Sequence, residues 1–404
     1  MHKEIKTMKD FKNLTILGIL GIPIGFIIGI IDTIFGKTLL KITDIRQTYP
    51  ILLIPFLALA GVIIVYCYNK WGGKSSKGMG LIFEVAQGKE EKIPLRLIPF
   101  IILSTWATHL FGGSAGREGV AVQLGATFSN WVGNKINIKD TRKIFLITGM
   151  SAGFAGLFQT PIAAIFFAVE VLIAGSIHYR ALIPAITASF MASTTSHLLG
   201  LEKFTFPLSL NINLDFLTIL KLIILGIIFG LIGGSFAICL KYAKTFFTNK
   251  IKNPIIRIFI IGIILSIIFL ILYKGRYSGL GTNLINASFY NEKIYVYDWV
   301  LKFILTIITL SIGFQGGEVT PLFSIGASLG VILASLFGLP IEFVASLGYI
   351  SIFGSATNTF FAPIFIGGEV FGYTYIPYFF IVMAFAYTFN FNKSIYSLQK
   401  INEY

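Results

Sequence analysis

Charged residues are scarce in this 404-residue chain. Asp, Glu, Lys and Arg make up 12% of it, whereas typical soluble domains carry about 25%. Hydrophobic residues make up 55%, and the mean hydropathy is +0.82. This composition argues against a disordered chain, a nucleic-acid-binding module or an ordinary cytosolic enzyme, and it favours a polytopic membrane protein.

Cysteine and histidine are scarce as well. The two cysteines, Cys67 and Cys239, lie in or beside apolar runs, so no disulfide framework is expected. The four histidines are scattered, and the sequence contains no H-E-x-x-H motif and no paired cysteines. We therefore expect neither a metal site nor a cofactor.

Acidic residues are outnumbered by basic ones, 18 against 32, which gives a net charge of +14. The basic residues lie mostly between apolar runs, which is typical of cytoplasmic loops and not of a nucleic-acid partner. Lys3, Lys6, Lys9 and Lys12 precede the first apolar run, and no signal-peptide cleavage pattern follows. We expect a cytoplasmic N-terminal segment over residues 1–13 and a multi-pass protein of the cell (plasma) membrane.

Long uncharged runs dominate the rest of the sequence. A membrane-spanning helix needs about 20 apolar residues, and runs of that order occur at 14–31, 97–116, 144–169, 181–201, 222–240, 319–341, 343–368 and 370–392. Many of them contain Gly or Pro: Pro23, Pro99, the cluster at 112–119, Pro161, Pro321 and Pro363. This pattern predicts discontinuous helices whose ends meet inside the membrane, where they must be buried in protein or line a cavity.

The sequence also has a weak internal repeat. Residues 116–126 can be aligned with 317–327, and Phe158-x-x-Pro161 with Phe360-x-x-Pro363. We therefore predict a first membrane repeat over 14–200 and a second over 201–404, which includes a C-terminal helix, with the substrate site at their interface. The chain ends soon after the last apolar run, so no soluble C-terminal regulatory domain is expected.

The segment Gly112–Gly119 is the first candidate site. Its glycines allow close backbone approach to a ligand, and the helix start that follows offers free N–H groups to an anion. A carboxylate at Glu118 can occupy such an anion site itself and leave when protonated, which would couple a proton to an anion. The structural alternative is that Glu118 caps the helix and pairs with Arg117; membrane carboxylates are nevertheless functional candidates.

Other candidates are less specific. Gly316–Pro321 marks a second helix start, where Glu318 either serves the site or caps the helix. Met79, in the turn at 77–80, and Tyr396 are by themselves a packing residue and an interfacial anchor. Ser151 and Ser328 lie in G-x-S-x-G patterns, which leave an intramembrane serine hydrolase as a remote alternative, although small residues mainly serve helix packing.

These segments resemble the CLC family of chloride channels and anion/proton antiporters. Gly116–Gly119 matches the start of the family's G-R-E-G-P segment, with Val120 in place of Pro. Three further segments match in order: 155–163 (A-x-x-F-N-x-P-x-A), 317–321 (G-G-x-F-x-P) and 355–363, the second-half counterpart of the first of these. The resemblance runs from about residue 14 to Tyr396.

Three departures from the family pattern are informative. Met79 replaces the serine whose hydroxyl binds chloride in the family, and a thioether is a poor anion donor. Together with the sequence G-G-E-V-T-P at 316–321, this resembles the fluoride/proton antiporter branch, CLC-F. Val171, after Glu170, replaces the glutamate that serves the inner proton path of chloride exchangers, so another route is needed and Glu318 is the candidate.

The resemblance implies an all-α membrane fold, a CLC-type inverted repeat of tilted and discontinuous helices, assembled as a homodimer. It implies export of fluoride in exchange for protons and hence fluoride resistance, with Glu118 and Glu318 as gating and proton-transfer residues. The implied anion-binding residues are Met79, Gly80, Gly116, Arg117, Gly119, Val120, Val319, Thr320 and Tyr396. A chloride/proton antiporter or a passive anion channel of the same family stays open as an alternative.

Overall fold

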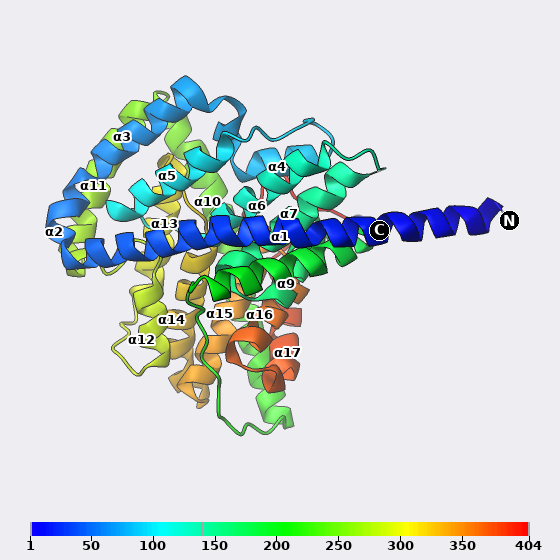
Figure 1. Ribbon diagram of the computed structural model, residues 1–404. Coiled ribbons are helices and arrows are strands. Elements are labelled where there is room, and N and C mark those ends of the chain that lie inside the picture. Colours follow the sequence, from blue (N-terminus) through cyan, green and yellow to red (C-terminus); the bar gives the residue numbers. More distant parts are fainter. Residues whose placement is uncertain (1, 139, 403–404) are drawn as a thin grey trace.

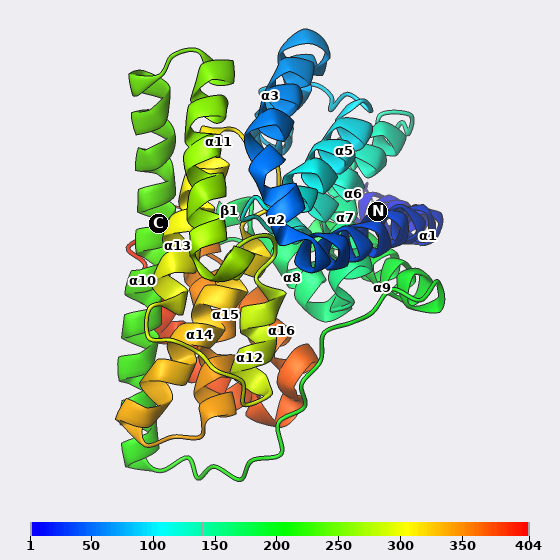
Figure 2. The same ribbon diagram turned by 90° about the vertical axis from the view of Figure 1, so that its left-hand side faces the viewer.

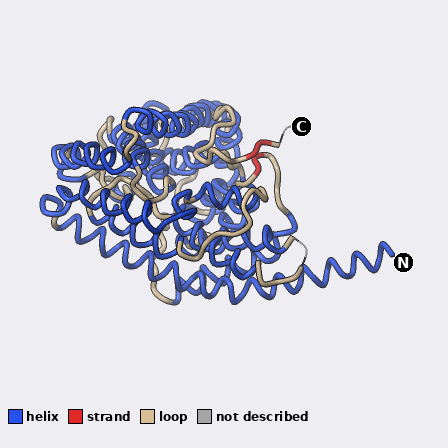
Figure 3. Tube along the Cα trace, turned by 90° about the horizontal axis from the view of Figure 1, so that it is seen from above, coloured by secondary structure: helices blue, strands red, loops and turns tan. Residues whose placement is uncertain are grey.

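The computed structural model describes residues 2–138 and 140–402, and most of them are helical (Figure 3). Met1, Lys139, Glu403 and Tyr404 lie outside the described residues, as therefore do the extreme ends of the predicted segments 1–13 and 201–404. The prediction of an all-α membrane protein is confirmed. The helices are α1 (His2–Thr48), α2 (Pro50–Leu53), α3 (Leu57–Cys67), α4 (Met79–Ala86), α5 (Leu97–Leu110), α6 (Glu118–Gly133), α7 (Thr141–Phe158), α8 (Pro161–Glu170), α9 (Leu182–Leu198), α10 (Phe216–Lys250), α11 (Pro254–Ile271), α12 (Thr282–Phe289), α13 (Asp298–Ile312), α14 (Val319–Phe337), α15 (Ile341–Thr357), α16 (Phe361–Phe371) and α17 (Ile376–Thr388).

Several helices can cross a membrane by length and composition. Helical stretches of 18 to 38 residues with mean hydropathy between 1.9 and 2.8 are found within α1, from α2 to α4, and in α10, α11 and α14. Large apolar side chains are exposed along them, for example Ile63 and Phe259. Such surfaces are stable in lipid and not in water, so the protein is embedded in a membrane.

The long helices are steeply tilted with respect to one another. In Figure 1 α1 is a nearly horizontal rod, whereas in Figure 2 α10 is nearly vertical and α1 points toward the viewer. The break expected at Pro23 is wrong, because α1 continues through it to Thr48. Glycines on α1 press against α9: a Cβ at Gly25 would lie 2.2 Å from the Ala188 carbonyl oxygen. This close packing of small residues holds the helix together across the proline.

The breaks predicted at Pro161 and Pro363 are confirmed. α7 ends at Phe158 and α8 begins at Pro161, the position where a proline costs no hydrogen bond. In the second half, α15 ends at Thr357 and α16 begins shortly afterwards. Gln159 and Asn358 take equivalent left-handed conformations, with φ of 56° and 54°, so the same chain reversal occurs in both halves.

The two halves of the chain lie side by side (Figure 2), joined by an extended segment at 199–215. At the centre Gly116 and Gly317 pair in an antiparallel bridge, with N···O distances of 2.5 and 2.8 Å. Side chains do not fit there, because a Cβ at Gly116 would lie 2.9 Å from Pro321. The bridge places equivalent residues of the two halves next to each other.

A short parallel ladder between β1 (Ile173–Ala174) and β2 (Lys400–Ile401) was not expected from the sequence. It is drawn in red near the C-terminus in Figure 3. Residues 390–399 are not helical, so Tyr396 lies on an irregular segment beyond α17. The ladder ties this segment to the first half of the molecule.

Candidate anion site

The starts of α4, α6 and α14 lie around the central bridge. Amides in the first turn of a helix have no acceptor within the helix, and the helix dipole adds positive charge there. The turn before α4 is built on Gly78, whose φ of 52° and ψ of −128° suit glycine. The centre of the molecule therefore presents N–H groups to an anion although it is surrounded by apolar helices.

The Glu118 carboxylate occupies this position. Its side chain is fully buried, and its Oε2 accepts hydrogen bonds from Thr320 N (3.1 Å) and Thr320 Oγ1 (2.5 Å) at the start of α14 and from Arg117 N (3.3 Å). Oε1 lies 3.6 Å from Arg117 Nε. Glu118 thus pairs with Arg117, as one sequence interpretation held, and also fills an anion-binding helix start of the opposite half.

Glu318 has a related place on the other side of the bridge. A Cβ at Gly119 would lie 3.9 Å from Oε2 of Glu318, so this carboxylate faces the start of α6. Each half therefore contributes a glutamate that faces the first turn of the other half's helix. Glu118 is sealed from solvent, whereas Glu318 lines a cavity.

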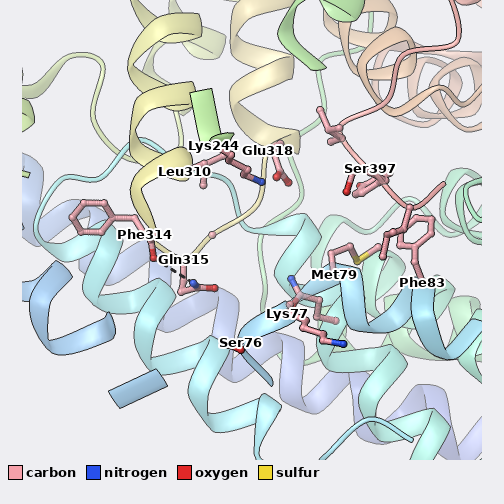
Figure 4. Close-up of a pocket in the computed structure, with 18 residues that line it drawn as sticks. Ser76, Lys77, Met79, Phe83, Lys244, Leu310, Phe314, Gln315, Glu318 and Ser397 are labelled. Carbon is pink, nitrogen blue, oxygen red and sulfur yellow. Dashed lines mark hydrogen bonds between the residues drawn. The ribbon is translucent and has the colours of Figure 1, made fainter. Parts of the chain in front are cut away.

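The cavity has a volume of about 270 Å³ and is lined by residues of both halves. Met79, Gly80, Glu318 and Tyr396 all face it. The remaining lining residues that carry side-chain charge or amide groups are Lys77, Gln123, Lys244 and Gln315. In Figure 4 Lys244 lies beside Glu318, and Met79 and Phe83 lie across the cavity. Lys244 adds positive charge to this lining, whereas Lys77 is paired with Glu84 and Glu90.

Tyr396 is held by a stack of rings. It is buried, and its ring lies 5.3 Å from that of Phe83, nearly parallel to it. Met79 packs against the apolar core and also faces the cavity. The irregular segment after α17 therefore brings Tyr396 to the place where α4 begins, which the sequence separation between Met79 and Tyr396 conceals.

Two residues expected to bind the anion, Gly116 and Val120, have backbone amides that donate to carbonyl oxygens of the protein. Gly116 N donates to Gly317 O across the bridge, and Val120 N donates to Arg117 O at 3.1 Å. Gly119 and Val319 keep first-turn amides. Nε and Nη1 of Arg117 are buried and have no hydrogen-bond acceptor among the described residues, so they are available to an anion close to Glu118.

Sequence reasoning missed three polar residues around the site. Gln123 donates to Gly119 O (3.1 Å) and lines the cavity; its spacing of four residues from Gly119 was the available signal. Lys244 carried no signal, because it lies on α10, far from every motif. Lys302 is fully buried and donates to Gly279 O (2.7 Å) and Ser114 Oγ (2.9 Å), which fixes the loop that leads to Glu118.

The starts of α8 and α16 are occupied by fixed carboxylates. The Glu170 carboxylate, at the end of α8, accepts from the amides at the start of α16 at distances of 2.9 to 3.2 Å: Phe360, Phe361 and Ala362. Glu369, near the end of α16, accepts from Ile162 N (3.2 Å) and Ala163 N (2.9 Å) at the start of α8. These helix starts are therefore closed to a mobile anion.

The two candidate serines do not form a nucleophile site. The Ser151 hydroxyl contacts that of Ser189, and Ser328 Oγ donates to the carbonyl oxygen of Ser324 (2.6 Å). Both are buried, and the hydrogen bonds of the described residues join neither of them to a histidine. The hydrolase alternative is not supported.

Comparisons with known proteins agree with this geometry. The family model described as voltage gated chloride channel matches residues 60–390. A chloride/fluoride channel protein of Pseudomonas syringae pv. tomato is 31% identical over 385 residues, which cover 94% of this chain and 85% of the relative.

Solved structures give the same result. The crystal structure of a CLC-type fluoride/proton antiporter superposes with a TM-score of 0.95 at 56% identity, over 96% of this chain and 98% of that chain. A slow cyanobacterial Cl⁻/H⁺ antiporter superposes with a TM-score of 0.79 at 19% identity, over 93% and 94% of the two chains. At this identity the second likeness concerns the fold alone.

Proposed function

Because the chain belongs to the voltage-gated chloride channel (CLC) family, a family of transporters and not of enzymes, we propose that it exports fluoride across the cell membrane in exchange for protons. The 56% identity to a CLC-type fluoride/proton antiporter supports this substrate pair. The observation that carries the proposal is the Glu118 carboxylate on the amide and hydroxyl of Thr320. The titratable carboxylate of Glu118 therefore occupies the position that we propose for the transported fluoride.

The exchange follows from the charge of Glu118. When ionised, the carboxylate is held by Thr320 and blocks the site. Protonation removes about half of this attraction, because hydrogen bonds to a charged acceptor are about twice as strong as neutral ones. The neutral side chain can then leave, carrying its proton, and fluoride takes the vacated donors. The carboxyl group of Glu118 therefore couples the movement of a proton to the movement of fluoride.

Fluoride is small and strongly hydrated, so the site must replace its water by well-placed donors. We propose the amides of Gly119, Val319 and Thr320 and the guanidinium of Arg117 for this role. Met79, Gly80 and Tyr396 line the approach from the cavity, where the Tyr396 hydroxyl can donate. The thioether of Met79 has no hydrogen to donate, so this side chain offers chloride no hydrogen bond.

The inner proton route requires a second titratable group, since Val171 is apolar. We propose Glu318, because it faces both the start of α6 and the cavity. A proton that enters through the cavity can reach Glu318 from water. Glu118 lies on the other side of the Gly116–Gly317 bridge, so a small movement of the two side chains would bring both carboxyl groups to the same helix starts, where the proton can pass between them.

Orientation and assembly complete the proposal. The segments 68–78, 87–96 and 134–140 carry several Lys and Arg residues, which supports a cytoplasmic N-terminus and a cytoplasmic cavity. With Cys67 and Cys239 replaced by serine, an impermeant maleimide applied to intact cells should therefore leave Lys92→Cys unlabelled. As the family resemblance implies, we propose a homodimer with one pathway per subunit, and light scattering in detergent should give twice the chain mass.

The decisive experiment uses purified protein in liposomes. Fluoride efflux and chloride efflux are recorded with electrodes, each with and without an imposed proton gradient. We expect proton-driven fluoride transport with little chloride transport. Chloride transport of equal rate would favour a chloride/proton antiporter, and fluoride flux indifferent to the proton gradient would favour a passive channel.

A further inference from the structure

A groove of about 340 Å³ lies between α3 and α5, and it shares no lining residue with the cavity at the anion site. Its walls are apolar: exposed Ile63 and Trp71 with half-buried Cys67 on one side, and exposed Pro99 and Leu103 with half-buried Ala107 on the other. Tyr68 and Ser104 lie at its floor, with hydroxyls 3.5 Å apart. Because these hydroxyls face each other, the groove presents almost only hydrocarbon.

One end of the groove is positively charged. Nζ of Lys70 lies 4.9 Å from the centre of the Trp71 ring, and Arg96 donates through Nη1 to the Trp71 carbonyl oxygen at 3.1 Å. Both cations are exposed, and the ion pairs found among the described residues include neither of them. The neighbouring Lys74 and Lys77, in contrast, pair with Glu90 and Glu84.

The position of this end matches the headgroup level of a bilayer. α3 ends and α5 begins here, and Trp71 lies beside Tyr66, with ring centres 6.1 Å apart. Tryptophan and tyrosine gather at membrane–water interfaces, and lysine and arginine near a membrane surface attract anionic lipids. The groove thus runs from an interface with free positive charge into the hydrocarbon region.

We propose that this groove binds an anionic phospholipid, with one acyl chain between α3 and α5 and the phosphate held by Lys70 and Arg96. An acyl chain matches the shape and the apolar walls, and filling the groove recovers dispersion contacts that an empty groove forfeits. The charge at one end selects an anionic headgroup. The arginine is suited to this task, since its planar fork can hold a phosphate through two hydrogen bonds.

The bound lipid would stand beside both segments that lead to the first half of the anion site. α3 continues through residues 68–77 into Gly78 and α4, and α5 leads into the loop that precedes Glu118, the first residue of α6. A lipid between α3 and α5 therefore fixes the separation of these two segments. This consequence rests on the proposed transport function, whereas lipid binding itself does not.

The two cysteines of the chain provide a test of binding. Cys67 is half-buried in the groove wall, and Cys239 is exposed on α10, outside the groove. The full-length protein in mixed micelles is treated with a membrane-permeant maleimide while phosphatidylglycerol replaces phosphatidylcholine. We expect modification of Cys67 to slow at least threefold and that of Cys239 to stay constant. Equal slowing at both, or slowing by phosphatidylcholine alone, would mean an annular lipid only and overturn the proposal.

Variants separate the headgroup from the chain. Lys70→Gln together with Arg96→Gln should remove the phosphatidylglycerol protection of Cys67, whereas Lys252→Gln, an exposed cation elsewhere, should retain it. Glycerol phosphate, which has the charge but no acyl chain, should not protect. Protection that persists in the double variant, or that glycerol phosphate reproduces, would contradict the assignment. Transport is not measured, so the result is independent of the proposed function.

Discussion

At the scale of single residues, the position of Glu118 decides the coupling. Its carboxylate accepts hydrogen bonds from the amide and hydroxyl of Thr320 in the opposite half. The ionised carboxylate and the anion therefore compete for the same hydrogen-bond donors. Glu118→Gln keeps the shape and removes the titration. We expect fluoride flux to lose its dependence on the proton gradient. The measurement is fluoride-driven proton uptake into liposomes with a pH-sensitive dye, and Glu292→Gln, an exposed residue, is the control. Proton uptake at the wild-type rate in Glu118→Gln would contradict the gate role.

Thr320 contributes a hydroxyl as well as an amide. In a Glu118→Gln background, where no carboxylate competes, Thr320→Val should weaken fluoride binding by about 1.5–3 kcal/mol, at least roughly tenfold, because one hydrogen bond to a charged acceptor is lost. Thr320→Ser keeps the hydroxyl and should bind nearly as well as the background protein. Titration calorimetry with fluoride measures both. Unchanged affinity in Thr320→Val would place the anion away from this hydroxyl.

Glu318 is the proposed inner proton carrier. Because Glu318 lines the cavity and gives no hydrogen bond to Glu118 among the described residues, neutralising it should interrupt proton delivery while leaving the donors around Glu118 in place. Glu318→Gln is therefore expected to lower fluoride-driven proton uptake at least tenfold and to keep fluoride binding measurable by calorimetry. If proton-coupled transport continues at the normal rate, protons enter by another path.

At the scale of helices, reciprocal carboxylate caps link the two halves. Glu170 accepts from amides at the start of α16 and Glu369 from amides at the start of α8. Since a lost hydrogen bond to a charged group costs about 1.5–3 kcal/mol and Glu170 accepts three of them, Glu170→Ala should lower the free energy of unfolding by at least about 4.5 kcal/mol. Glu369→Ala, which loses fewer bonds, should lower it less.

Unfolding in mixed micelles with rising dodecyl sulfate measures this loss, with Glu292→Ala as an exposed control. Glu170→Gln keeps the shape but only one of the two acceptor oxygens, so it should unfold between the wild type and Glu170→Ala and still transport with proton coupling. Loss of proton coupling in folded Glu170→Gln protein would mean that the proton route passes through Glu170 and not through Glu318.

Some features of the helices and of the site could be predicted from the sequence, and others could not. Family membership, confirmed by the model that matches residues 60–390, and the breaks at Pro161 and Pro363 were predictable, because proline and glycine act on the local backbone. The engaged amide of Gly116 was not, since it donates across the bridge between the halves. Lys244 was missed for the same reason, because only tertiary packing brings α10 to the cavity. The uninterrupted course of α1 through Pro23 depends on its glycine contacts with α9.

At the scale of the whole molecule, the irregular segment after α17 brings Tyr396 to the cavity. Gln399 Nε2 donates to Val171 O (2.9 Å) and to Thr357 O (3.0 Å), one in each half, and β2 pairs with β1 just beyond it. Tyr396 lies on the segment held in this way. We infer that the C-terminal segment acts as a strap that positions Tyr396 against the cavity.

Gln399→Ala removes both side-chain bonds of the strap. Each neutral hydrogen bond contributes about 1 kcal/mol, so we expect a modest loss of stability, because most of the core is untouched. The larger effect should fall on the apparent fluoride affinity, which is expected to weaken about threefold to tenfold in liposome flux assays, since Tyr396 is then held less firmly. Tyr396→Phe should produce a similar loss through the missing hydroxyl. If Gln399 acts through Tyr396, the apparent fluoride affinity of the double variant Gln399→Ala/Tyr396→Phe should be no lower than that of Tyr396→Phe alone. Additive losses would instead mean that the strap supports another part of the site.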